Sequence, residues 1–96
     1  MSPSSETGLE PGVAERIVRL PVDLHARPAG KFSQLAARYS SEVTVGVGDR
    51  AVDARSVLMV MALGATAGTE VTIRARGEDA GGAVRDLGDL LASIAE

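Results

Sequence analysis

The sequence predicts a two-layer α+β domain in which helices cover one face of a largely antiparallel sheet. Several segments alternate polar and apolar residues with a period of two, which is typical of strands with one wet face. Other segments repeat apolar residues three and four positions apart, as helices with one buried side do. The predicted order is β-α-β-β-α-β-α, which favours helices packed on one side of a sheet.

The first half of the pattern is a strand followed by a helix. Glu15–Leu20 alternates as a short strand, which Pro21 ends. A helix is expected to begin at or just after His25 and to end near Arg38. A proline in its first turn costs nothing, because the first N–H groups of a helix have no partner within it. The helical spacing is carried by five residues: Ala29, Phe32, Leu35, Ala36 and Tyr39.

The second half contains a hairpin, a short helix, a strand and a last helix. Glu42–Val47 and Arg50–Ala54 are predicted strands on either side of a Gly-Asp turn. Ser56–Gly64 is predicted to be a short helix, with a serine N-cap and a glycine just past its end. Thr69–Gly77 alternates as a strand. The last helix is predicted from the apolar stripe of Ala83, Val84, Leu87, Leu90, Leu91 and Ile94.

Length and composition indicate one small domain. The chain has 96 residues, of which 45% are hydrophobic, too many for a disordered chain. Residues 1–12 are polar and include proline and glycine, so we expect a flexible tail there and the folded domain at residues 13–96.

Composition also excludes several functions. The lack of cysteine rules out disulfides, thiolate catalysis and cysteine-bound zinc or iron–sulfur clusters, and it fits a reducing compartment. A net charge of −3 without a basic stripe is unlike a nucleic-acid-binding domain. No apolar run could cross a bilayer, and the N-terminus lacks a signal-peptide pattern. We therefore expect a cytoplasmic protein that needs no cofactor or metal, inserts in no membrane and binds no nucleic acid.

The stretch LHARPAG, Leu24–Gly30, holds the only histidine of the chain. At the start of a helix, His25 would lie beside backbone N–H groups that lack an intrahelical partner and beside the positive end of the helix dipole. Arg27 adds a permanent cation with a planar fork of donors. This combination suits a phosphate, and a neutral imidazole can act as a nucleophile towards phosphorus. The stretch therefore predicts a phosphohistidine site.

Other roles for His25 stay open on the residues alone. A lone histidine at a helix start is often a capping or surface residue. A hydrolytic triad is disfavoured because no second conventional base is apparent. A metal site is equally weak, since Asp23 is the only acidic neighbour.

Three stretches together resemble the HPr family, the histidine-containing phosphocarriers of the bacterial phosphoenolpyruvate:sugar phosphotransferase system. They are LHARPAG, ARSVLMVMALGA and GTEVTIRARGEDAGGAVRDLGDLL, and the resemblance extends over about residues 15–95. It implies an open-faced β-sandwich, with four antiparallel strands covered on one face by three helices. By the same resemblance, phosphorylated enzyme I phosphorylates His25 on Nδ1, and Arg27 helps to hold the phosphoryl group. The group then passes to enzyme IIA-type proteins for carbohydrate uptake.

The resemblance also implies regulatory and docking residues. Ser56 matches a regulatory serine that a kinase, with a matching phosphorylase, modifies in some bacteria; a serine N-cap also needs no regulation. Val57, Leu58 and Met61 match an exposed apolar docking patch, while Met59 and Val60 are candidates for an inward pair. Secondary docking candidates lie on the preceding helix: Ala26, Gly30 and Gln34.

One residue of the histidine loop departs from the family pattern. Asp23 stands where the family often has glycine, and its carboxylate could repel an incoming phosphate. A carrier of a regulatory, nitrogen-linked or dihydroxyacetone kinase chain would use the same chemistry with other partners. A further alternative is a regulatory interaction domain controlled by phosphorylation of Ser56, although the His25–Arg27 pair argues against that as the sole function. We expect a monomer.

Overall fold

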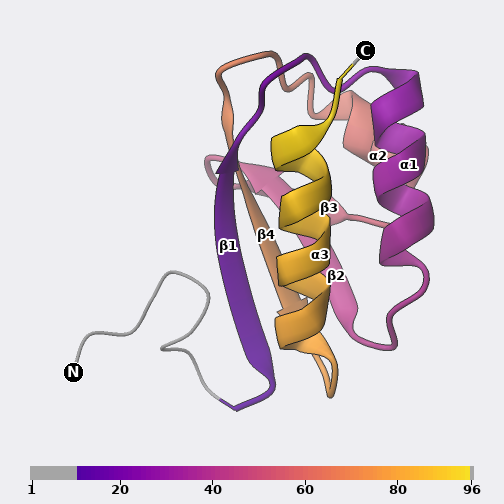
Figure 1. Cartoon of the computed structure of the whole chain (residues 1–96), viewed down its shortest axis with the longest axis vertical. Helices are drawn as coiled ribbons and strands as arrows, with labels where there is room; N and C mark the ends of the chain where they lie inside the picture. Colours follow the sequence, from indigo (N-terminus) through magenta and orange to yellow (C-terminus); the bar gives the residue numbers. More distant parts are fainter. Residues whose placement is uncertain (1–10, 96) are drawn as a thin grey trace.

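The computed structural model describes residues 11–95. Most of the expected tail, residues 1–10, lies outside this range, so its flexibility stays a prediction. The described part contains seven elements in the predicted order (Figure 1): β1 Val13–Arg19, α1 Ala26–Ala36, β2 Glu42–Val47, β3 Arg50–Asp53, α2 Val57–Ala62, β4 Glu70–Arg76 and α3 Ala80–Ser93.

The four strands form one sheet in the order β1-β4-β2-β3, and every neighbouring pair is antiparallel. The register places Ile73 of β4 opposite Val45 of β2, and Val45 opposite Val52 of β3. α3 packs on β1 and β4, α2 packs on β3, and α1 contacts both other helices. Three helices therefore cover one face of the sheet, which confirms the predicted open-faced β-sandwich (Figure 1).

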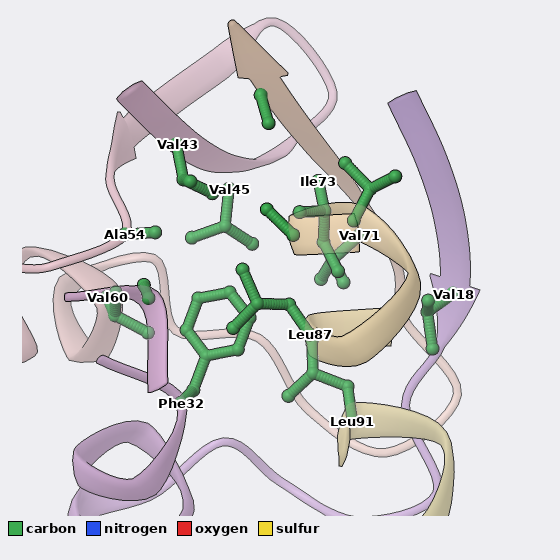
Figure 2. Packing of buried hydrophobic residues seen from close by; sticks show 14 of the residues in the cluster. Val18, Phe32, Val43, Val45, Ala54, Val60, Val71, Ile73, Leu87 and Leu91 are labelled. Atoms are coloured by element: carbon green, nitrogen blue, oxygen red, sulfur yellow. The ribbon is translucent and has the colours of Figure 1, made fainter. Parts of the chain in front are cut away.

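The core lies between the sheet and the helices. Most inward positions of the strands are buried valine, isoleucine or alanine, and Figure 2 shows the Phe32 ring of α1 among Val45, Val60 and Leu87. Phe32 is fully buried. It anchors the helix whose first residue follows the histidine, so core packing positions the candidate site.

Candidate functional site

His25 occupies the N-cap position of α1, where its backbone is extended, with φ −76° and ψ −172°. Its carbonyl oxygen accepts the hydrogen bond of the Ala29 amide at 2.9 Å, which closes the first turn. The imidazole makes no side-chain capping hydrogen bond to the helix, and the residue is exposed. The side chain of His25 therefore lies exposed at the start of α1 and does not cap the helix.

The first turn of α1 gathers groups that favour an anion. It contains no acidic residue, and the exposed Arg27 lies in it. The amides of Ala26 and Arg27 belong to the first four N–H groups of the helix, which have no carbonyl acceptor within it. Pro28 follows and is buried, so this end of the helix is held against the core. A phosphate beside His25 would meet N–H donors at the positive end of the helix, and Arg27 lies two residues further along the chain.

A pocket of about 270 Å³ opens beside the histidine. It joins the start of α1 to the loop that follows α2, and its lining residues are Asp23, Leu24, His25, Met61, Gly64, Ala65 and Thr66. Two other hollows, of about 260 Å³ and 160 Å³, lie over the strands β2, β3 and β4 and include no His25 atoms. The sequence alone did not indicate that Gly64, Ala65 and Thr66 are neighbours of His25, because small residues in a loop carry no chemical signal of their own.

Two hydrogen bonds from backbone amides hold the two walls of this pocket together. The Leu24 amide donates to the Ala65 carbonyl at 3.0 Å, and Asp23 Oδ1 accepts from the Ala67 amide at 2.8 Å. Gly64 has φ +65°, a conformation that favours glycine, and it turns the chain away from the end of α2. The segment that follows α2 therefore lies against the loop that contains His25.

α2 presents the expected apolar surface with one correction. Leu58 is 78% exposed and Met61 39%, but Met59 is 46% exposed, so its prediction as an inward residue was wrong. Val60 is fully buried, as predicted. In a helix of six residues the inward side is set by positions three apart, and Val57 is the half-buried residue that shares it with Val60. The outward patch is therefore Leu58, Met59 and Met61, which we call the α2 patch.

The remaining predicted residues lie at the two ends of α2 and along α1. Ser56 is the N-cap, and its Oγ accepts the Met59 amide at 3.2 Å, as the capping prediction requires. Ser56 is not among the residues that line the histidine pocket, whereas Met61 is. On α1, Ala26 and Gln34 are exposed and Gly30 is half-buried. Their spacing of four residues puts them on one side of α1. The helix α1 as a whole lies beside α2.

Two other kinds of site are absent from the part of the chain that the structure describes. Between residues 11 and 95, no three His, Cys, Asp or Glu side chains are grouped so that they could hold a metal ion. Within the same range no helix is long and apolar enough to cross a membrane.

Comparisons with known proteins match this geometry. The family model described as "PTS HPr component phosphorylation site" matches residues 14–93. The phosphocarrier protein HPr of Haemophilus influenzae is 41% identical over 71 residues, which are 74% of this chain and 84% of that protein. A multiphosphoryl transfer protein of Xanthomonas campestris is 32% identical over 96 residues, which are 97% of this chain but only 12% of that protein's length.

Solved structures agree on the fold. The phosphocarrier protein HPr from Bacillus anthracis superposes with a TM-score of 0.77 at 30% identity, covering 82% of this chain and 96% of that one. The crystal structure of an HPr dimer from Thermoanaerobacter tengcongensis gives a TM-score of 0.68 at 40% identity, covering 73% of this chain and 80% of that one. The family model spans nearly all of the described residues, and it covers both the histidine loop and α2. The chain therefore belongs to the HPr family of the phosphoenolpyruvate:sugar phosphotransferase system.

Proposed function

We propose that this protein is a phosphocarrier that accepts a phosphoryl group on His25 from phosphorylated enzyme I and passes it to enzyme IIA-type proteins. The observation that carries the proposal is the exposed imidazole at the start of α1, which takes no part in capping the helix. It opens on a pocket and is followed by Arg27. Membership of the HPr family supports the same chemistry.

The transfer step requires few groups. An imidazole nitrogen of His25, Nδ1 by family resemblance, attacks the phosphorus of the donor phosphohistidine. The new P–N bond forms as the donor P–N bond breaks, and the donor imidazole leaves with its electron pair. The N–H groups of the first turn and Arg27 hold the phosphoryl oxygens, so the site acts by positioning and by charge. The same step in the opposite sense passes the group on.

The docking surface combines the α2 patch with the outward side of α1. Leu58 and Met61 supply apolar contact, and Met59 extends the patch beyond the residues that the sequence indicated. Exposed thioether side chains adapt to partners of different shape, which suits a carrier that must bind both a donor and an acceptor. Val57 is half-buried and contributes at the margin.

Ser56 is a candidate for regulation at the same surface. Its hydroxyl caps α2, so a phosphate on it would lie at the positive end of the helix and would add negative charge beside the α2 patch. We infer that phosphorylation of Ser56 would weaken docking rather than alter His25. If Ser56 serves only as the N-cap of α2, docking is not regulated through this residue.

Assembly, boundaries and location remain proposals. The HPr of Thermoanaerobacter tengcongensis has been solved as a dimer, so the expected monomer is a prediction that a sedimentation measurement must test. The domain at residues 13–96 and its cytoplasmic location are likewise proposed.

The proposal is tested by incubating the protein with phosphoenolpyruvate and a bacterial enzyme I, followed by intact mass measurement and acid treatment. We expect one acid-labile phosphate on the wild type and none on His25→Ala. A Ser56→Ala variant serves as the matched control and should accept the phosphate as the wild type does. A label that survives acid, or one that persists in His25→Ala, would assign the phosphate elsewhere. If enzyme I gives no label, a dihydroxyacetone kinase system or a nitrogen-linked donor is tested next.

A further inference from the structure

Asp23 is held in a fixed position beside the candidate phosphoryl site. Its side chain is half-buried, and Oδ1 accepts the Ala67 amide at 2.8 Å across the gap between two loops. The neighbouring Leu24 amide donates to the Ala65 carbonyl at 3.0 Å. The carboxylate is therefore part of the contact that joins the histidine loop to the α2–β4 loop.

Asp23 and His25 line the same pocket of about 270 Å³. A carboxylate on a flexible side chain could swing away from an anion, but a hydrogen bond to a backbone amide restrains it. Any phosphoryl group on His25 is thus added to a pocket that already carries a fixed negative charge.

We propose that Asp23 keeps a negative charge at the pocket and thereby lowers the affinity of the His25 site for phosphate. The proposal rests on the proposed function, because it concerns the phosphoryl group that His25 would carry. Arg27 and the helix N–H groups favour the group, and Asp23 opposes it. Asp23 exchanges no proton or electron pair in the transfer. Its effect is to make the phosphoryl group easier to pass on and slower to accept.

Inorganic phosphate is the direct probe of this charge. The wild type, Asp23→Asn and Asp23→Ala are titrated with phosphate at constant ionic strength, and binding is followed by the amide NMR shifts of the histidine loop. Asn retains an oxygen acceptor for the Ala67 amide but has no charge. A divalent anion and a single charge about 8 Å apart in water change an affinity by about fivefold. We therefore expect phosphate to bind Asp23→Asn about fivefold more tightly than the wild type at low salt.

Salt and a second variant separate charge from structure. The gain should disappear near 1 M salt, where charges are screened within about 3 Å. Asp49→Asn is the matched control, because it removes the same charge from the β2–β3 turn, which does not line the pocket. Its affinity should equal that of the wild type. Equal affinities for wild type and Asp23→Asn, or no detectable phosphate binding to any variant, would overturn the proposal.

Hydrogen exchange of the Ala67 amide shows whether the loop contact is kept. Protection should persist in Asp23→Asn and fall in Asp23→Ala, where no acceptor remains. If Asp23→Asn also lost protection, a change in its phosphate affinity would reflect loop rearrangement, and the proposed charge effect would be rejected.

A chemical donor distinguishes this proposal from the proposed function itself. Phosphoramidate can phosphorylate a histidine without any protein partner, with ammonia as the leaving group, and it is an anion at neutral pH. We expect Asp23→Asn to gain an acid-labile phosphate about twofold faster than the wild type, because this donor carries a single net negative charge. A wild type that gains none contradicts the phosphocarrier function, and the phosphate titration then decides on Asp23 alone. A wild type that is labelled as fast as Asp23→Asn contradicts only the role of Asp23.

Discussion

The two ends of α1 differ in what they leave exposed. At the histidine end, residues 23–27 and 64–67, hydrogen bonds to backbone amides join two loops, and the side chains of His25 and Arg27 are exposed. At the clasp end, residues 39–41 with α3 and the turn before it, the Ser40 and Ser41 amides and the Tyr39 hydroxyl donate hydrogen bonds to carboxylates. The helix between them is about 16 Å long. One end of α1 thus leaves His25 and Arg27 exposed, while the other is tied to α3 and the turn before it.

The clasp end is held by two carboxylates of α3 and the turn before it. Asp79 accepts hydrogen bonds from the Ser40 and Ser41 amides, both at 2.9 Å, and from the Ser41 hydroxyl. These bonds, with that of the Ser41 hydroxyl largest, lower the pKa of Asp79 to about 2. The Tyr39 hydroxyl donates to Asp86, and burial followed by this bond raises the pKa of Tyr39 to about 12. Neither group changes its protonation at any pH near neutrality.

The comparison predicts that function is lost at one end of α1 and stability at the other. The largest effect is expected from His25→Ala, which should abolish phosphate acceptance, because no other imidazole exists in the chain. Its free energy of unfolding should change by about 0.5 kcal/mol or less, as for other exposed residues. Intact mass and urea denaturation measure the two quantities. A large loss of stability would show that the histidine also has a structural role.

Arg27→Ala should slow phosphate acceptance by about 100-fold, because the site loses a donor to the charge that develops on the phosphoryl oxygens. Arg27→Lys should fall between this variant and the wild type, since it keeps the charge but loses the planar fork. Rates are measured by quenched-flow labelling with phosphorylated enzyme I. Equal rates for Arg27→Ala and wild type would remove Arg27 from the site.

Met61→Glu should weaken binding to enzyme I by about tenfold, or about 1.4 kcal/mol, because it places a charge in an apolar contact. The matched control is Ile17→Glu. Ile17 is 51% exposed and lies on β1, in the sheet, rather than on the α1–α2 surface. Calorimetric titration should show a loss of affinity for Met61→Glu alone. Equal losses would indicate an effect of net charge rather than of the α2 patch.

Asp79→Ala should lower the melting temperature, because it removes the hydrogen bonds that hold the α1–β2 loop. The rate of phosphate acceptance should not change, because this loop lies at the end of α1 opposite His25. The pH dependence has a definite sign. The pKa of Asp79 is lowered from 3.8 to about 2 in the folded state, so its contribution is present above pH 3.8 and is lost as the pH falls through 2. The melting temperatures of the wild type and Asp79→Ala should converge below pH 2. A difference that stays constant with pH would contradict the stabilising role of the Asp79 carboxylate.

Tyr39→Phe is expected to have the smallest effect, a loss of about 1 kcal/mol in the free energy of unfolding from one hydrogen bond. Phosphate acceptance should not change. Urea denaturation gives the loss, and the Asp79→Ala/Tyr39→Phe pair should be nearly additive if the two contacts act independently. Reduced acceptance in Tyr39→Phe would show that the two ends of α1 are coupled.

Local patterns in the sequence predicted most elements and the location of His25. The period of two marked the strands, Pro28 marked the start of α1, and Ser56 and Gly64 marked the ends of α2. What could not be predicted depends on contacts between distant residues. Nothing local places β4 between β1 and β2, and nothing in Asp79 indicates that it binds a loop almost forty residues earlier in the chain.

The difference between local patterns and contacts of distant residues also explains what the sequence missed at the site. Met59 was named with Val60 as a candidate for an inward pair, although the helix phase set by the buried Val60 turns it outward. The pocket wall formed by Gly64, Ala65 and Thr66 follows from two hydrogen bonds to the histidine loop. Residue type predicted the reactive group, but only the tertiary structure supplied its surroundings.

A chase experiment tests the central claim, that the histidine end both accepts and releases a phosphoryl group. The phosphorylated protein is separated from its donor and mixed with an enzyme IIA-type protein, and both chains are followed by intact mass. The account predicts that this protein loses its acid-labile phosphate as the acceptor gains one, much faster than the phosphate hydrolyses in buffer alone. Loss of the phosphate at the hydrolysis rate only, with no gain on the acceptor, would contradict the account.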